Sequence, residues 1–141
     1  MVTKNLTKEY SVMKISEQGS DIIHGQLPRK LPDLGTFVLS VAINYDSFPR
    51  ALCDPGSSVN LMPRSLAMRL GYSNLEPTFI TLVLADRSTR IQDGILSNVP
   101  VMIEKSMIAT DFVVFSYEKE PKDPLIFGRP FLHTARAIID V

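Results

Sequence analysis

The spread of ten prolines through 141 residues is the strongest constraint on the fold of this chain. Proline breaks the interior of a helix because it lacks a backbone N–H and clashes with the preceding turn. We therefore expect many short elements and no long helix. Hydrophobic residues make up 45% of the sequence, which is enough for a packed core and too much for a disordered chain. The length fits one domain with an additional tail.

Apolar residues that recur at every second position predict that most of these elements are strands. The alternation is clearest over residues 37–44, where a polar or small residue separates each pair of large apolar ones. A turn is expected over 45–49. Further strands are expected over residues 50–53, 79–84, 90–95, 99–103, 112–115 and 125–127.

Two short helices are expected between these strands. Pro63 can open a helix because its missing N–H has no partner at that position, and Gly71 is a natural stop. This pattern predicts a helix over Pro63–Leu70, and Phe131–Ala137 is a candidate for a second one. The fold class is therefore mostly β.

Residues 1–34 show weak periodicity and contain two prolines, Pro28 and Pro32, within a short stretch. Regular structure is not expected there. We interpret residues 1–34 as a linker or polyprotein remnant, partly disordered, and residues 35–141 as the folded domain.

Charge and cysteine content exclude several classes of function. Lys plus Arg and Asp plus Glu both number 15, so no electrostatic reason exists to expect nucleic acid or an anionic membrane as a partner. The single cysteine, Cys53, cannot form an intrachain disulfide. His24 and His133 lie far apart in the sequence without a cysteine cluster, so we expect no metal and no cofactor.

The N-terminal residues Met1–Tyr10 are polar, and no apolar run approaches the ~20 residues of a membrane-spanning helix. We therefore expect neither a signal peptide nor a transmembrane segment, and an intracellular, cytoplasmic location.

Asp54 is the candidate catalytic residue. It follows an apolar strand and opens the run Asp-Pro-Gly-Ser-Ser at residues 54–58. One interpretation is a plain β-turn, because Pro fixes φ and Gly tolerates positive φ. The other is a catalytic loop, in which the strand aims the carboxylate and Gly56 and Ser57 offer backbone N–H groups to it. The tripeptide alone favours the turn, and its context between strand and helix favours catalysis.

Three runs together resemble the retropepsin-type aspartic proteases encoded in plant gypsy-class retrotransposon polyproteins. The first spans residues 51–63, where Asp54–Ser58 stands in place of the family's Asp-Thr/Ser-Gly-Ala/Ser motif. The second spans 82–88. The third begins at Pro124, contains Ile-Phe-Gly-Arg-Pro at 126–130, and continues to Val141. The resemblance covers roughly residues 31–141 and rests on the order and spacing of the runs.

The resemblance implies a small β-barrel and a homodimer in which each subunit brings one catalytic Asp54 to a two-fold axis. The paired carboxyl groups would share one proton across a water molecule, since like charges ~3 Å apart cannot both ionise. The ionised member would act as a general base and the protonated member would donate to the scissile carbonyl. The implied substrate is a polypeptide, the Gag-Pol polyprotein of the retroelement.

The resemblance also assigns supporting roles. Gly56 and Ser57, with Ser58 beside them, would hold the carboxylates coplanar through backbone N–H groups. Residues 84–91 would form a flap that closes over the peptide, although an ordinary surface hairpin is the alternative. The flap residues expected to meet substrate are Ala85, Asp86, Arg87 and Ser88.

Two residues near the C-terminus are expected to be structural. Gly128 would allow close backbone approach behind the catalytic loop. Arg129 is expected to be a buried structural cation rather than a substrate contact. In retroviral relatives this arginine meets an acid near the catalytic loop, and Ser58 stands in that place here.

Pro55 departs from the family pattern. Most aspartic proteases carry Thr or Ser there, and plant retroelement relatives often carry Leu, so the hydroxyl is not always required. Proline supplies neither the hydroxyl nor the N–H. The alternative that Pro55 favours is a catalytically degenerate module that dimerises or holds peptides without cutting them. A third interpretation is a domesticated host protein with a retropepsin domain used in protein turnover, to which the segment before Leu31 gives no positive support. Relatives also continue past Val141 with a strand that joins the dimer sheet, so an end at that point is expected to weaken dimerisation.

Overall fold

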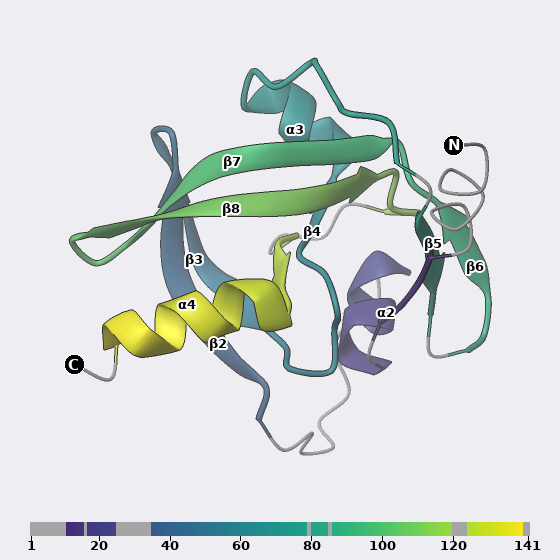
Figure 1. Cartoon of the computed structure of the whole chain (residues 1–141), viewed down its shortest axis with the longest axis horizontal. Helices are drawn as coiled ribbons and strands as arrows, with labels where there is room; N and C mark the ends of the chain where they lie inside the picture. Colours follow the sequence, from purple (N-terminus) through teal and green to yellow (C-terminus); the bar gives the residue numbers. More distant parts are fainter. Residues whose placement is uncertain are drawn as a thin grey trace, which may run out of the picture.

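The computed structural model describes residues 11–15, 17–24, 35–78, 80–84, 86–119 and 124–139. Its centre is a closed barrel with the strand order β2-β3-β9-β4-β8-β7 (Figure 1). The barrel strands are β2 (Phe37–Ile43), β3 (Asp46–Cys53), β4 (Leu61–Pro63), β7 (Gly94–Ile103), β8 (Ser106–Phe115) and β9 (Ile126–Phe127). The predicted mostly-β barrel is therefore confirmed.

The turn predicted over residues 45–49 is shorter in the structure, because β3 already begins at Asp46. Asn44, with a φ of 55°, makes the reversal. Pro49 then lies inside β3, where the pairing with β2 shifts between Leu39 and Val41. Such an irregularity tolerates proline because one residue of the strand needs no ladder hydrogen bond.

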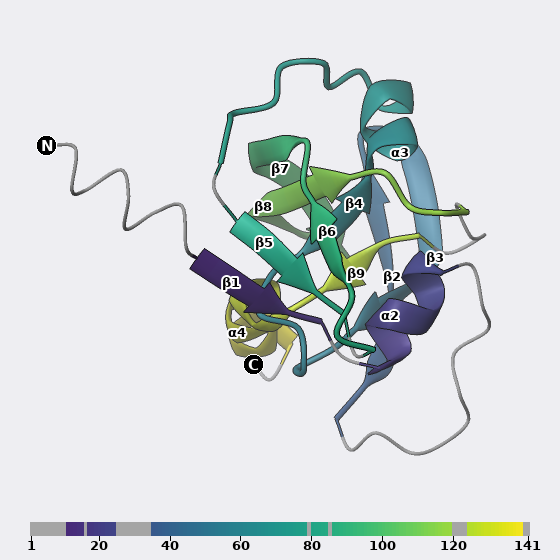
Figure 2. The same ribbon diagram turned by 90° about the vertical axis from the view of Figure 1, so that its right-hand side faces the viewer.

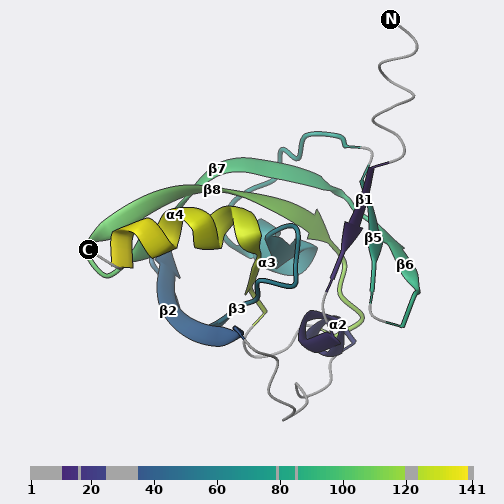
Figure 3. The ribbon, with the colours of Figure 1, turned by 60° about the horizontal axis from the view of Figure 1, so that its bottom comes forward.

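Both predicted helices are present. The first, α3, spans Arg64–Arg69, with Pro63 as its N-cap residue, and Gly71 follows it with a φ of 94°. The second, α4, spans Arg129–Ile139 and is longer than the predicted Phe131–Ala137. It lies against the barrel, between the β7–β8 hairpin and β2 in the view of Figure 3.

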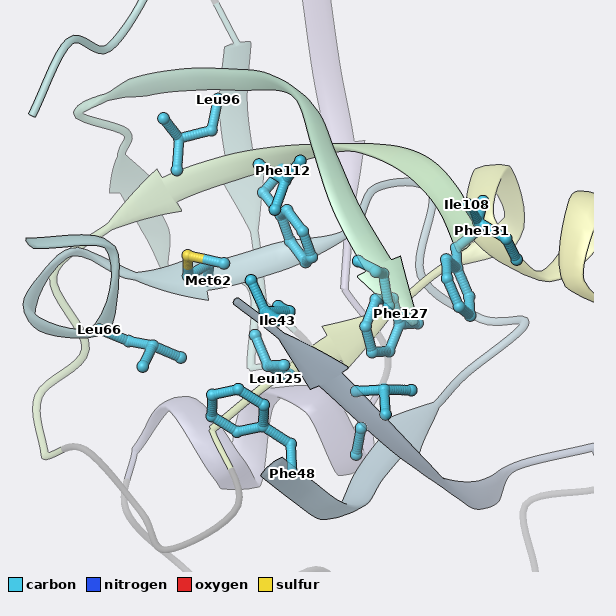
Figure 4. Close-up of a cluster of buried hydrophobic side chains, with 14 of the residues drawn as sticks. Ile43, Phe48, Met62, Leu66, Leu96, Ile108, Phe112, Leu125, Phe127 and Phe131 are labelled. Carbon is cyan, nitrogen blue, oxygen red and sulfur yellow. The ribbon is translucent and has the colours of Figure 1, made fainter. Parts of the chain in front are cut away.

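One hydrophobic cluster fills the barrel (Figure 4). Phe127 lies near its centre, with its ring centroid 5.6 Å from that of Phe112 and 4.0 Å from that of Phe131. Phe131 and Ala135 are one helical turn apart, so the same face of α4 closes the barrel. This packing fixes β9, and with β9 the segment that follows it.

A second, three-stranded sheet has the order β1-β5-β6 and lies beside the barrel (Figure 2). Its strands are β1 (Ser11–Lys14), β5 (Ile80–Val83) and β6 (Thr89–Ile91). β1 pairs with β5 in parallel, and β5 pairs with β6 as an antiparallel hairpin.

The interpretation of residues 1–34 as a linker needs correction where the structure describes them. β1 and the helix α2 (Glu17–Ile23) occupy part of this range. Ile15, Ile22 and Ile23 are buried in a second hydrophobic cluster, which explains why this segment is ordered despite its weak periodicity. The other residues of 1–34 that were assigned to the linker, namely 1–10, 16 and 25–34, lie outside the described part.

Candidate active site around Asp54

Pairing between β3 and β9 positions Asp54. The two strands run in parallel, with Leu52 opposite Ile126 and Cys53 opposite Phe127. Asp54 follows directly, and its backbone N–H donates to the carbonyl of Phe127 at 2.8 Å. Its side chain is 0% exposed in the isolated chain.

The loop that begins at Asp54 supplies hydrogen-bond donors to its own carboxylate. The backbone N–H of Gly56 donates to Oδ1 of Asp54 at 2.8 Å. The hydroxyl of Ser57 contacts Oδ2 at 3.5 Å, and the Ser57 N–H donates to the Asp54 carbonyl at 3.1 Å. The local structure is therefore a turn that also holds the carboxylate in a fixed orientation.

Gly128 lies directly behind this loop. A Cβ at that position would lie 2.4 Å from the carbonyl oxygen of Val59 and 2.6 Å from that of Ser57. The N–H of Gly128 donates to the side chain of Asn60 at 2.8 Å, and the N–H of Arg129 donates to the Ser57 carbonyl at 3.0 Å. The two segments touch through their backbones, and a side chain at Gly128 would separate them.

The expectation of a buried Arg129 is wrong. Its side chain is exposed, and Nη1 donates to the carbonyl oxygen of Pro55 at 3.1 Å. The reason is that Arg129 opens α4 at the surface, so the guanidinium reaches over the outside of the loop. Ser58, the residue expected in the place of the arginine's acidic partner, is half-buried.

Pro55 lies at the exposed tip of the loop. Its carbonyl accepts the Arg129 hydrogen bond, and its ring lies against Gly35, where a Cβ would be 3.2 Å from Cγ of Pro55. The bonds to the Asp54 carboxylate come from Gly56 and Ser57. Within one subunit, proline at position 55 therefore leaves the orientation of Asp54 intact.

The segment predicted as a flap is the hairpin of β5 and β6. Arg87 turns the chain with a φ of 69°. The N–H and the hydroxyl of Ser88 donate to Oδ1 of Asp86 at 2.9 Å and 2.5 Å. Both bonds favour the ionised carboxylate and lower the pKa of Asp86, with the hydroxyl bond the larger cause. Ala85 lies outside the described residues.

The base of this hairpin packs beside the Asp54 loop. Leu82 and Leu84 belong to the same hydrophobic cluster as Leu52 and Val59, which flank Asp54 in sequence. At its turn, Asp86 lies 3.4 Å from Nε2 of His24. The structure thus brings the predicted loop and hairpin to one region and adds a histidine that the sequence did not single out.

Asn60 is the structural residue of this region that sequence analysis missed. It is 3% exposed, and its amide also donates to the carbonyl of Asp111 at 3.0 Å. The available signal was an amide side chain inside the apolar run from Val59 to Met62, because a polar side chain buried among apolar ones needs hydrogen-bond partners.

Cys53 precedes Asp54 and is fully buried. Burial, with a smaller contribution from the charge of Asp54, raises the pKa of the thiol to about 12. In the described part of the chain, no group of three or more His, Cys, Asp or Glu side chains is arranged to hold a metal ion. Nor do the described residues include a helix of the length and apolarity that crossing a membrane requires.

Comparison with solved structures identifies the fold. The crystal structure of the retroviral protease-like domain of Ddi1 from Leishmania major is similar to this chain, with a TM-score of 0.52 and 19% identity over 73% of this chain and 77% of that one. At this identity the likeness establishes a shared fold, so the barrel is retropepsin-like. A scan against protein-family models gives no match, and a search of curated proteins gives none either.

Proposed function

We propose that the chain is an aspartic endopeptidase that works as a homodimer, with one Asp54 from each subunit. The observation that carries the proposal is the Asp54 loop. A carboxylate at the end of a barrel strand accepts the Gly56 N–H at 2.8 Å and is backed by Gly128. The retropepsin-like fold supports the same assignment.

In this mechanism the paired Asp54 carboxyl groups bind one water molecule and share one proton. One member takes a proton from the water as it attacks the scissile carbonyl, and the other donates to the carbonyl oxygen. The Gly56 N–H donates to each carboxylate and restricts its rotation.

The proposed substrate is a polypeptide, and the sequence resemblance suggests the Gag-Pol polyprotein of a retroelement. The side chains near Asp54 that would meet it are apolar: Leu52 and Ile126 from barrel strands, Val59 from the segment between β3 and β4, and Leu82 and Leu84 from the hairpin. We expect cleavage between apolar residues for this reason.

A peptide-cleavage assay with the full chain tests the proposal. We expect a peptide with an apolar pair at its centre to be cut by the wild type. The Asp54→Asn variant should lose at least about 10³-fold in rate, since an amide cannot act as the general base. Asp46→Asn is the matched control, because Asp46 is exposed on β3. Cleavage that survives Asp54→Asn would reject Asp54 as the catalytic residue. Analytical sedimentation of the same protein measures whether the chain forms a dimer.

A second candidate function is a module that dimerises or holds peptides without cutting them. Pro55 favours it, because proline offers no hydroxyl and no N–H for reciprocal bonds between the two loops of a dimer. Its signature would be peptide binding without cleavage in the wild type and cleavage restored in Pro55→Thr. If Pro55→Thr and the wild type cut at the same rate, this candidate is rejected.

A further inference from the structure

We propose that β1, α2 and His24 act as an intramolecular inhibitor of the Asp54 site. In this arrangement α2 covers the apolar surface beside Asp54, while β1 and His24 fix the β5–β6 hairpin in position over it. The inference rests on the proposed function, because it assigns regulation to the same site.

The first observation is that α2 lies against the barrel on the side of the β5–β6 hairpin (Figures 1 and 3). Ile22 is 5% exposed and Ile23 is 0% exposed. Both belong to the cluster that contains Leu52 and Val59 on one side and Leu82 on the other. A substrate has to place its own side chains between loop and hairpin, so α2 and a peptide compete for one surface.

The apolar surface that α2 covers adjoins the catalytic residue. Leu52 lies two positions before Asp54, and Ile126 pairs with Leu52 on β3 and with Leu61 on β4. These side chains share one cluster with Ile22 and Ile23. α2 therefore packs against apolar residues that flank Asp54 in the sequence and pair beside it in the barrel.

The second observation is that β1 extends the hairpin into a sheet. Its register with β5 runs from Ser11 opposite Ile80 to Lys14 opposite Val83, and the N–H of Ile15 continues the ladder to the Val83 carbonyl at 2.9 Å. A hairpin that closes over substrate has to open first. Opening this hairpin breaks the ladder or carries β1 with it.

The third observation is a group of polar contacts at the end of α2. Nδ1 of His24 lies 2.9 Å from a carboxylate oxygen of Glu118, and Nε2 lies 3.4 Å from Asp86 at the hairpin turn. Arg90 on β6 also binds Glu118. The N–H of Glu118 donates to the carbonyl of Ile23 at 3.3 Å. His24 thus joins α2, the hairpin turn and the segment after β8.

Binding of an uncleavable ligand tests the inference without requiring catalysis. The probe is a peptide with apolar side chains on both sides of a hydroxyethylene unit in place of the scissile bond, and calorimetry with the full chain measures its affinity. We expect His24→Ala to raise the affinity about 5-fold, since exposed ionic contacts are individually weak. His133→Ala is the matched control, because His133 is exposed on α4.

Ile23→Asp is a stronger variant, because a carboxylate in the apolar cluster expels α2. We expect a gain in affinity of about 10-fold or more. Hydrogen exchange should increase in the hairpin, residues 80–91, and stay unchanged in β2, which contributes no side chain to this cluster. If Ile23→Asp does not fold, His24→Ala decides the question.

The outcomes separate this inference from the proposed function. Probe affinity that is equal in the wild type and in folded variants overturns the inhibitory role, and so does undetectable binding in every variant. A gain in affinity with no cleavage by any variant supports that role and rejects the enzymatic activity. Cleavage by the wild type as fast as by His24→Ala and Ile23→Asp rejects the inhibitory role and leaves the activity standing.

Discussion

The backbone N–H of Gly128 donates a hydrogen bond to Oδ1 of Asn60 at 2.8 Å. The amide of the same Asn60 side chain donates to the carbonyl of Asp111 at 3.0 Å, and the Asn60 carbonyl accepts the N–H of Val113 at 2.8 Å. One buried residue thus joins the Asp54 loop to β8 and to the start of α4. This connection holds in place Gly128, which lies directly behind the Asp54 loop.

Replacing Asn60 with leucine removes both side-chain bonds and leaves a buried donor at Gly128 without its partner. We expect a loss of about 3 kcal/mol in the free energy of unfolding, because an unsatisfied buried polar group costs about 1–3 kcal/mol. Urea denaturation measures it. The control is Asn74→Ala at an exposed position, and a change below about 0.5 kcal/mol in Asn60→Leu would contradict the structural role.

The close approach of Gly128 to the loop gives a second prediction. In Gly128→Ala the new Cβ would lie 2.4 Å from the Val59 carbonyl oxygen, so the backbones have to separate. We expect a destabilisation of about 3 kcal/mol or more. Gly71→Ala is the comparison, because no atom lies within 4 Å of its Cβ and the cost there is strain at a φ of 94°. Equal losses of thermal stability in both variants would show that packing at Gly128 is loose.

The thiol of Cys53 should be inert in the folded protein. It is 0% exposed, and its pKa of about 12 keeps it protonated at neutral pH. Thiolate is the reactive form, so we expect no modification by iodoacetamide at pH 7.5 until the chain is unfolded in denaturant. Mass spectrometry follows the reaction. Rapid modification under native conditions would show that the end of β3 opens readily.

The sequence predicted the barrel strands best where alternation was regular. β2 appears where residues 37–44 alternate, and Gly71 follows α3 as expected. Two separate strands were predicted over residues 90–95 and 99–103, whereas β7 is one strand that runs from Gly94 to Ile103. The cause is the irregularity between Leu96 and Val99, where Asn98 takes a φ of 59° and interrupts the pattern.

Candidate site residues could be found where local chemistry is concentrated, as in the Asp54 loop. Contacts between segments that lie far apart in the chain could not be predicted from the sequence. Nothing near Ile22 and Ile23 indicates that they pack beside Leu52 and Leu82. The exposed position of Arg129 likewise follows from where α4 begins, which alternation and motif spacing do not determine.

The contact between His24 and Glu118 gives the last prediction. The hydrogen bond from His24 is the largest cause that lowers the pKa of Glu118 below its ordinary value of 4.5. The pKa of Asp86 is lowered chiefly by the Ser88 hydroxyl. In His24→Ala we therefore expect the pKa of Glu118 to rise toward 4.5 and that of Asp86 to change less. NMR titration of the side-chain carboxyl carbons measures both, with His133→Ala as the control.

The direction of these shifts fixes the pH dependence of the hairpin. A carboxyl group whose pKa is lower in the folded state stabilises that state above its unfolded pKa, and the contribution is lost as pH falls through the folded value. We expect the contacts of Glu118 and Asp86 to be fully formed above about pH 4.5 and to weaken below it. Chemical shifts of residues 80–91 should therefore move with the Glu118 carboxyl in the wild type. In His24→Ala these chemical shifts should move less. If the chemical shifts of residues 80–91 do not change as the Glu118 carboxyl titrates, in either protein, the role of His24 is contradicted.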